Sequence, residues 1–376
     1  MQLTKYKLGD LIAQRREKNK DYDLPIRGVS REGFIKPKIE EADTSIYNVF
    51  YKNDFVFNPA RMELNSIALN LDLDKALCSS LYEVFYVKDE NVVLPEFLNL
   101  HIKRDEFARH CDYIGLGSAR EYCRFANIAE FDIKIPPIEI QREIVQADRQ
   151  IKRRIRLNEQ MIEKLEATAQ ALYRKMFVDG IDKENLPEGW RMGTIEEFCK
   201  DMKSGGTPSR NHSEYWNKKD YPWLKTGEVH NNVILETEEF ISKAGLDNSS
   251  AKLIPQGSII MAMYGATAAQ VAYLDCETTT NQACCNMICQ NKADAAYLFF
   301  HLLENQQDIK KLANGGAQEN LSQELIAQQP IILPNGIKEK ELFVPILDRI
   351  VIKYKENSNL SELQSLLLAK MGNLKK

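Results

Sequence analysis

The chain has 376 residues, 44% of them hydrophobic and 28% charged, and a formal net charge of −4. This length suits two domains with connecting structure, and the composition is typical of a globular chain rather than a disordered one. No apolar run reaches membrane-spanning length and no secretory apolar stretch follows Met1, so we expect a cytoplasmic protein without a membrane segment.

Charge and cysteine spacing narrow the function classes further. Residues 1–39 carry ten Lys or Arg against five Asp or Glu, a local basic excess that is compatible with binding phosphate groups. No C-x-x-C pair or zinc-finger spacing occurs, and we interpret Cys284, Cys285 and Cys289 near His301 as buried groups of an apolar strand. We therefore predict no metal site.

The first half of the chain begins with a mixed globular segment. Apolar stretches at residues 54–57 and 81–87 predict strands, and residues 94–104 predict a short helix. A long helix follows, because no Pro or Gly interrupts residues 138–178 and apolar side chains recur at steps of three and four. These positions are Ile140, Ile144, Ala147, Ile151, Ile155, Asn158, Ile162, Leu165, Ala169, Leu172 and Met176. A seam of more than five heptads favours a coiled coil.

The second half follows the same plan. Strands are predicted at residues 258–261 and 286–289 and a helix at 293–304, before a second long helical tract. Pro345 is tolerated because it falls in the first turn of that tract. Its seam comprises Phe343, Leu347, Ile350, Tyr354, Asn357, Leu360, Leu363, Leu367 and Met371.

These two halves are an internal repeat. Residues 117–121 match residues 315–319, and the register continues without gaps to residues 133–136 against residues 331–334. Near the start of each copy, Leu8-Gly9-Asp10 resembles Met192-Gly193-Thr194. We therefore predict an α+β fold of two similar globular domains with a pseudo-two-fold internal repeat. The expected boundaries are 1–138 and 187–334 for the domains, and 139–180 and 335–376 for the helical spacers.

Asn158 and Asn357 occupy the same seam position when Ile151 is matched with Ile350 and Ile155 with Tyr354. Equivalent positions near the centres of two similar helices coincide only in an antiparallel pair. A buried Asn pair fixes register at a cost in stability, although an exposed Asn is the alternative interpretation. These six residues are our candidates for helix pairing.

Familiar catalytic motifs are missing. The sequence has no G-x-x-x-x-G-K-[ST] loop, no G-x-G-x-x-G after a strand and no nucleophile elbow. Asn58-Pro59-Ala60 lacks the second proline and the aromatic residue of an amino-methyltransferase motif, and His110-Cys111-Asp112 places neighbouring side chains in different directions. We expect a binding protein with no catalytic residues.

One loop-rich segment makes the sequence recognisable. Residues 203–210 read Lys-Ser-Gly-Gly-Thr-Pro-Ser-Arg and precede Tyr215-Trp216 and Pro222-Trp223. The two glycines permit unusual backbone conformations, while hydroxyls and basic groups can contact phosphates or base edges. With the later Tyr264-Gly265-Ala266-Thr267, Asn281-Gln282-Ala283 and Asn320-Leu321-Ser322, this order of motifs resembles the specificity subunit of type I restriction-modification systems.

The first half carries a variant of the same signatures. Its matching segments are Pro25-Ile26-Arg27-Gly28-Val29-Ser30, Asn58-Pro59-Ala60-Arg61-Met62 with Ser66-Ile67, and Glu139 to Val145 at the first helix. The resemblance thus covers nearly the whole chain. Ala268-Ala269 depart from it, because many relatives carry a glycine after Gly-Ala-Thr.

The resemblance implies two target-recognition domains separated by an antiparallel coiled coil, each domain reading half of a bipartite, asymmetric site in double-stranded DNA. It implies two modification subunits that dock on the helices and methylate adenine with S-adenosylmethionine, and a restriction motor that can join them. This chain would hold no cofactor. A non-enzymatic coiled-coil adaptor that binds proteins through its duplicated domains is the alternative. The DNA-contact candidates are Arg27, Ser30, Arg31, Arg61 and Ser66, with Lys203, Ser204, Gly206, Thr207, Lys225, Tyr264 and Thr267.

Overall fold

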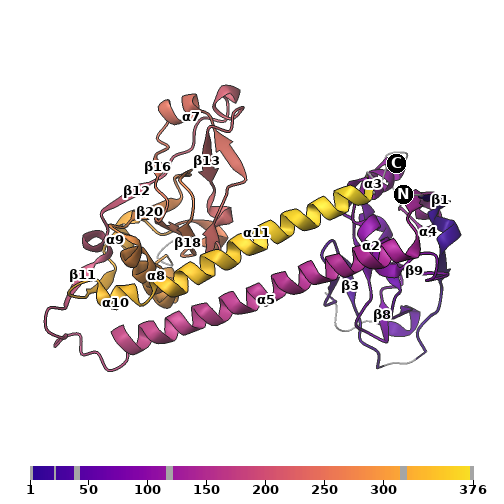
Figure 1. Ribbon diagram of the computed structural model, residues 1–376, viewed down its shortest axis with the longest axis horizontal. Coiled ribbons are helices and arrows are strands. Elements are labelled where there is room, and N and C mark those ends of the chain that lie inside the picture. Colours follow the sequence, from indigo (N-terminus) through magenta and orange to yellow (C-terminus); the bar gives the residue numbers. More distant parts are fainter. Residues whose placement is uncertain (1–2, 21–22, 38–42, 116–121, 314–319, 373–376) are drawn as a thin grey trace. The chain divides into compact units, whose positions relative to one another are not determined.

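The computed structural model describes residues 3–20, 23–37, 43–115, 122–313 and 320–372. The matching repeat segments 117–121 and 315–319 lie outside these ranges. The chain divides into a first unit of residues 1–153 and 360–376 and a second unit of residues 154–359. The two divisions fall within the two longest helices, α5 (Ile138–Phe177) and α11 (Val344–Gly372) (Figure 1).

The first unit is built on a four-stranded antiparallel sheet with the order β2-β9-β6-β7. Phe55, Phe57 and Phe85 fill one face of it together with residues of α2, while Val56 and Val84 face a smaller second cluster. The strands are β1 (Thr4–Lys7), β2 (Ile12–Arg15), β3 (Gly28–Ser30), β4 (Gly33–Ile35), β5 (Asn48–Tyr51), β6 (Phe55–Phe57), β7 (Ile67–Leu69), β8 (Lys75–Cys78), β9 (Glu83–Val87) and β10 (Asp132–Ile135). The helices are α1 (Leu8–Leu11), α2 (Pro95–Ile102), α3 (Asp105–Gly115) and α4 (Phe125–Ala129), with 3-10 turns η1 (Thr44–Ile46) and η2 (Pro59–Leu64).

The second unit contains a five-stranded sheet with the order β12-β20-β17-β18-β14, a four-stranded sheet with the order β15-β13-β19-β16, and the pair β11-β21. Its strands are β11 (Arg191–Thr194), β12 (Asp201–Ser204), β13 (Tyr221–Leu224), β14 (Asn232–Ile234), β15 (Glu239–Ile241), β16 (Leu253–Ile254), β17 (Ile259–Ala262), β18 (Val271–Leu274), β19 (Thr278–Thr280), β20 (Cys284–Ile288) and β21 (Pro330–Leu333). Its helices are α6 (Ile195–Phe198), α7 (Lys243–Asp247), α8 (Lys292–Lys311), α9 (Gln323–Ala327) and α10 (Lys338–Glu341), with 3-10 turns η3 (Ser213–Tyr215), η4 (Thr226–Glu228) and η5 (Gly265–Thr267).

Strand pairing in the two units repeats residue by residue. Arg15 pairs with Val84, which pairs with Val56, just as Ser204 pairs with Cys285, which pairs with Met261. The two-domain α+β fold expected from the sequence repeat is confirmed. The second sheets differ, because β5 pairs antiparallel with β8 whereas β13 pairs parallel with β19.

The predicted start of the repeat was wrong by three residues. Thr4 pairs with Ile135 and Arg191 pairs with Leu333, so Thr4 corresponds to Arg191 and Leu8 to Ile195. Both Leu8 and Ile195 are fully buried at the beginning of a short helix. Burial of that one apolar side chain sets the register, and Gly9 does not correspond to Gly193.

The predicted helical seam holds in the second unit and changes in the first. Among residues 154–177 and 344–359, Ile162, Ala169, Leu347 and Ile350 belong to one buried cluster. In the first unit, Ala147 and Leu363 are exposed, contrary to the prediction. Asp148 and Gln364 take the inward positions, because Gln364 donates a hydrogen bond to Asp148 at 2.6 Å.

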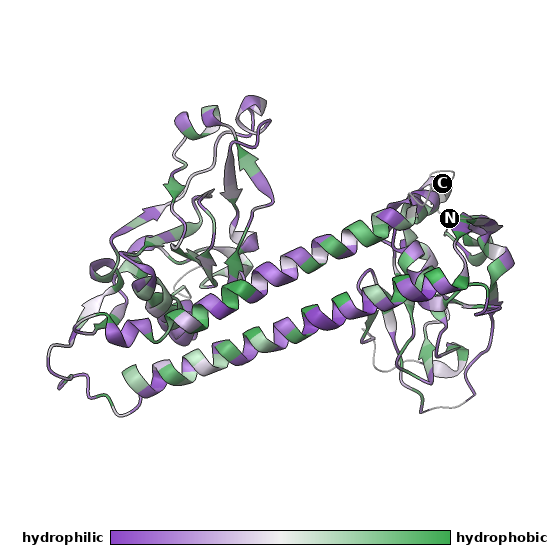
Figure 2. Cartoon of the chain, in the orientation of Figure 1, coloured by the Kyte–Doolittle hydropathy of each residue, from purple (hydrophilic) through white to green (hydrophobic). Residues whose placement is uncertain are grey.

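Hydropathy along α5 and α11 agrees with helices that bury one stripe. Figure 2 shows hydrophobic and hydrophilic residues alternating along both of them. Pro345 is the second residue of α11, where a missing N–H is tolerated. Within the described ranges, no helix has the length and apolar character needed to cross a lipid bilayer.

Candidate nucleic-acid interface

Gly205 and Gly206 allow a tight approach of two chain segments after β12. A Cβ atom on Gly205 would lie 2.2 Å from the carbonyl oxygens of Thr280 and Asn281, and one on Gly206 would lie 2.3 Å from Ser250 Oγ. Neither glycine has a positive φ. The reason for glycine here is therefore space rather than a positive φ.

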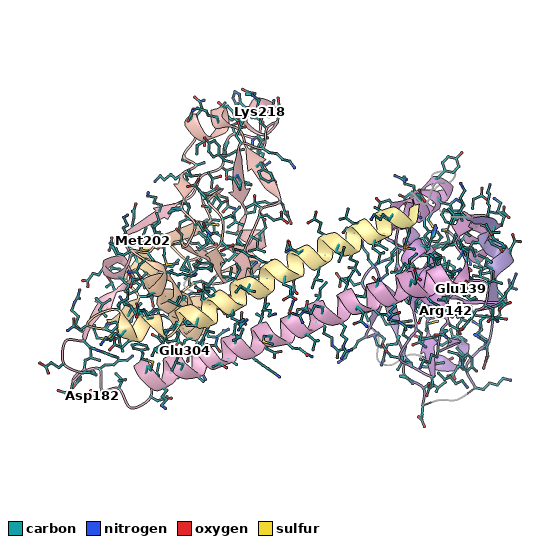
Figure 3. All side chains as sticks on the ribbon, in the orientation of Figure 1. Glu139, Arg142, Asp182, Met202, Lys218 and Glu304 are labelled. Carbon is teal, nitrogen blue, oxygen red and sulfur yellow. The ribbon has the colours of Figure 1, made fainter. Side chains whose placement is uncertain are left out.

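The side chains around these glycines hold the loop against its neighbours. Ser204 Oγ donates to Gln323 Oε1 at 2.6 Å, and Gln323 Nε2 donates to the carbonyl of Met202, which is labelled in Figure 3. Thr207 donates to the side-chain oxygen of Gln282. Lys203 lies 2.9 Å from Asp201 and keeps about a third of its side chain exposed. The predicted candidates Lys203, Ser204, Gly206 and Thr207 thus form one continuous segment.

Arg210 braces the same loop from its far end. Its guanidinium lies 3.5 Å from the centre of the Trp216 ring and 5.1 Å from that of Trp223, and donates to Glu239 at 2.6 Å. Trp223 Nε1 in turn donates to the carbonyl of Gly206 at 3.0 Å. Arg210 was not among the predicted site residues. The aromatic residues that follow it in the sequence are the signal that could have found it.

Lys225 is held beside this cluster by two carboxylates. Its Nζ lies 3.0 Å from both Glu238 and Glu239, and these hydrogen bonds raise the pKa of its ammonium group. Arg210, then Lys225, lowers the pKa of Glu239 despite the opposing effect of partial burial. The Lys225 ammonium group therefore stays cationic, and 34% of its side chain is exposed, as a phosphate contact requires.

The loop between β17 and β18 supplies Tyr264 and Thr267. Tyr264 is 40% exposed, whereas Thr267 Oγ1 donates to the carbonyl of Thr226 at 3.1 Å. Ala269, at the position where the family pattern departs, has φ of 66° and is fully buried. The alanine therefore adopts the left-handed conformation that a glycine would adopt more easily.

The predicted residues of the first unit divide into exposed and internal groups. Arg31 in the turn between β3 and β4 and Arg61 in η2 after β6 are both exposed. Arg27 donates to the carbonyl of Ile26, and Ser30 donates to the carbonyl of Gly33. Ser66 is 3% exposed and its hydroxyl donates to the carbonyl of Val29 at 3.0 Å, which makes it a link between two loops.

Asn158 and Asn357 lie together in the second unit. Asn158 Nδ2 donates to Asn357 Oδ1 at 2.8 Å, and Asn158 is 2% exposed. Arg154 on α5 donates to Glu356 on α11 at 2.5 Å, which with Lys353 lowers the pKa of Glu356 to about 2.

The two helical segments run antiparallel here, since Tyr173 and Phe177 pack near Phe343 at the other end. At that end Arg174 also forms an ion pair with Glu304, labelled in Figure 3. Ile155 and Tyr354 are half-buried and Ile350 is fully buried in this unit, while Ile151 is buried in the first unit.

The cysteine and histidine group near β20 is part of the core. Burial raises the pKa of the Cys284 thiol to about 12, and that of Cys285 still further. His301 Nδ1 shares a hydrogen bond with Tyr173 Oη at 2.6 Å, and burial lowers the pKa of His301 to about 3. In the part of the chain that the structure describes, no three His, Cys, Asp or Glu side chains are grouped as a metal site.

Comparison with known proteins identifies relatives that cover much or part of the chain. The specificity subunit of the type I restriction enzyme HindI from Haemophilus influenzae is 24% identical over 379 aligned residues, covering 80% of this chain and 82% of that protein. The specificity subunit of EcoR124I/EcoR124II from Escherichia coli is 27% identical over 172 residues, covering 44% of this chain and 41% of that protein. The crystal structure of a type I restriction-modification S subunit from M. genitalium matches with a TM-score of 0.59 at 15% identity, covering 98% of this chain and 96% of that one, which shows a shared fold.

The model of the type I restriction modification DNA specificity domain matches residues 3–167 and again residues 187–364. Each match covers one copy of the repeat that the strand registers define. The chain therefore belongs to the type I restriction modification DNA specificity family.

Proposed function

We propose that each globular part of this non-catalytic specificity subunit reads one half of a bipartite, asymmetric DNA site through the loops at one end of its main sheet. The single observation that carries this proposal is the repeated strand register, because it gives two copies of one loop arrangement with different side chains. Two similar scaffolds with different loops suit two different half-sites. The family match favours this function over the protein-binding adaptor.

The second unit supports the proposal through its cations and hydroxyls. Lys203, Lys225 and Arg210 surround the loop that carries Ser204 and Thr207, and each cation is positioned by a carboxylate or an aromatic ring. Side chains fixed in this way lose little freedom when they bind, which is favourable for discriminating between bases. We propose that some of these groups contact phosphates and others contact base edges.

The paired helices are proposed to form an antiparallel coiled coil that separates the half-sites and binds two modification subunits. These partners would bind S-adenosylmethionine and methylate adenine, and a restriction motor would join the same assembly. The long seams of α5 and α11 and the Asn158–Asn357 hydrogen bond support this role. Cytoplasmic localisation is part of the same proposal, because the substrate is the DNA of the cell.

Mapping of methylated adenines tests the division between domains. The chain is co-expressed with its modification subunits, and the methylated sites of the host genome are sequenced for the parent and for Arg61→Ala and Lys225→Ala. Each substitution is expected to alter only one half of the methylated site. Lys311→Ala is the matched control for Lys225→Ala, because Lys311 also forms an exposed ion pair, with Asp308. Equal changes in both halves would contradict the proposal.

The spacer proposal has a separate test. Inserting four residues after Leu165 and four after Ile350 lengthens both paired segments by about 6 Å, since an α-helix rises about 1.5 Å per residue. DNA rises about 3.4 Å per base pair, so the preferred gap should grow by one or two base pairs. An active complex that methylates sites with the original gap would refute the ruler role of the helices.

A further inference from the structure

Four motif segments of the second unit converge at one end of its main sheet. Ser204 ends β12 and is followed by residues 205–207, Tyr264 follows β17, Asn281 and Gln282 precede β20, and residues 320–322 precede α9. Thr207 bonds to Gln282, and the amide of Leu321 donates to the carbonyl of Met263 at 2.9 Å. The segments that identify the family are therefore neighbours in space.

The repeated registers locate the counterparts of these segments in the first unit. Because Arg15 corresponds to Ser204 and Val84 to Cys285, Lys18 corresponds to Thr207 and Leu81 to Gln282. The amide of Cys123 donates to the carbonyl of Pro59 at 3.1 Å, one residue beyond the counterpart of Met263, to which Leu321 donates. The gapless register of the repeat then makes Tyr122 and Arg124 the counterparts of Asn320 and Ser322.

In the first unit these counterparts line a pocket of about 370 Å³. All four segments contribute to it, through Arg16 and Lys18, Asn58, Leu81, and Tyr122 with Arg124. In the second unit, a hydrogen bond joins the side chains of Thr207 and Gln282. Their counterparts in the first unit are Lys18 and Leu81, and Lys18 donates instead to the carbonyl of Ile46. The volume is at the lower end of ligand pockets, which hold roughly 300–1,000 Å³.

The chemistry of the pocket is cationic and partly aromatic. Four of its lining residues, Arg15, Arg16, Lys18 and Arg124, are basic, and one, Glu83, is acidic. Asp54 neutralises Arg15 through two hydrogen bonds of 2.6 and 3.0 Å, and Arg16, Lys18 and Arg124 carry the remaining positive charge, which Glu83 offsets in part at Arg124.

Glu83 positions Arg124 at the edge of the pocket. The Glu83 carboxylate accepts from Arg124 at 3.2 Å and from the amide of Phe125 at 2.7 Å, while 61% of the Arg124 side chain stays exposed. The guanidinium also lies 5.5 Å from the centre of the Tyr122 ring, and Tyr122 is 50% exposed. A guanidinium fixed at one nitrogen still offers N–H groups in the fork geometry that matches the O6 and N7 atoms of guanine.

We propose that this pocket receives a nucleotide of the first half-site, with Arg16 and Lys18 on its phosphate, Arg124 on a base edge and Tyr122 against the sugar or base. The inference rests on the proposed function and deepens it. It assigns base reading in the first unit to Arg124, away from the β3–β4 hairpin that carries Arg27 and Arg31. The ligand class is a nucleotide because the pocket combines phosphate-binding cations with an exposed aromatic ring and an amide side chain.

The test uses the purified complex with its modification subunits and duplexes that carry the mapped site or single-base variants of it. For Arg124→Gln, we expect the affinity for the parent site to fall about tenfold and the preference at one base of the first half-site to relax. Arg124→Lys keeps the charge and loses the fork, so it should retain more affinity than Arg124→Gln without restoring the base preference. Arg16→Gln and Lys18→Gln should weaken all duplexes alike and reduce the salt slope by about one each.

Each variant carries its own folding control, because reading of the second half-site should be unchanged. Lys134→Gln, at an exposed position of β10, is the matched control and should leave base preference unchanged, while Arg31→Gln tests the β3–β4 hairpin as the alternative reader. If Arg31→Gln relaxes the first half-site and Arg124→Gln does not, the pocket assignment is wrong while the proposed function stands. If neither those variants nor Lys225→Ala change any half-site, the proposed function itself fails.

Discussion

Replacing Asn158 by leucine should destabilise the second unit, whereas replacing Asn158 and Asn357 together should be nearly neutral. Asn158 is 2% exposed and donates a 2.8 Å hydrogen bond to Asn357, which is half-buried. The single change leaves the Asn357 amide facing an apolar side chain. The double change removes both polar groups and extends the apolar seam.

The size of the effect follows from the burial of the remaining amide. An unsatisfied buried polar group costs about 1–3 kcal/mol, and partial access of water to Asn357 places the single variant in the lower half of that range. We therefore expect about 1–2 kcal/mol of destabilisation for Asn158→Leu and about 2–3 kcal/mol for Asn357→Leu, because the latter leaves the 2% exposed Asn158 amide unpaired. The double variant should lie within about 0.5 kcal/mol of the parent, so that the two changes couple by about 2 kcal/mol or more.

Urea unfolding monitored by tryptophan fluorescence measures this difference. Trp190, Trp216 and Trp223 all belong to residues 154–359, so the fluorescence reports on the unit that contains the asparagine pair. With a slope of roughly 2–3 kcal/mol per molar urea, the midpoint should fall by about 0.5 M for Asn158→Leu and by about 1 M for Asn357→Leu. Asn359→Leu, on the exposed side of α11, is the matched control. Additive single effects, with no coupling beyond about 0.3 kcal/mol, would refute the pairing argument.

Three further predictions concern the loop, the core and pH. Gly205→Ala should destabilise the second unit by about 2 kcal/mol or more, because the new Cβ would overlap two carbonyl oxygens. Gly227→Ala is the control and should be tolerated, because a Cβ there meets nothing within 4 Å. Equal urea midpoints for the two variants would contradict this prediction. The Phe343 ring is fully buried near Tyr173, Phe177 and Phe300, so Phe343→Ala should lower the free energy of unfolding by about 3–5 kcal/mol in the same assay. A loss below about 1 kcal/mol would contradict a role of this ring in the core. Burial, and then the charge of Glu163, raises the pKa of the Glu166 carboxyl from 4.5 to about 7. The folded state therefore holds this proton more tightly than the unfolded state, and it loses stability as the pH rises from 4.5 to 7. Glu166→Gln should therefore stabilise the unit at pH 8 by an amount on the order of 1 kcal/mol after solvent screening, with no gain at pH 4; a gain that is the same at both pH values would contradict the assignment.

Helix periodicity and the internal repeat could be predicted from the sequence because both are recorded locally. Apolar residues at steps of three and four in residues 138–178 predict a helix, and α5 spans Ile138–Phe177. Matching the two seams was enough to bring Asn158 and Asn357 to equivalent positions, and the structure places their amides together. The motif order predicted the family for the same reason, since each motif is a short continuous segment.

The tertiary structure decided the features that depend on atoms far apart in the chain. Asp148 takes an inward position only because Gln364 bonds to it, and no hydropathy pattern contains that contact. Gly205 is required by the carbonyl oxygens of Thr280 and Asn281, some 75 residues later in the sequence.

The pocket around Arg124 shows the same dependence on long-range contacts. It is formed where the ends of separate strands meet, and the sheet register that brings them together is set by burial of alternate side chains. Sequence periodicity determines which face of each element is buried, whereas pairing between distant elements determines which exposed side chains become neighbours.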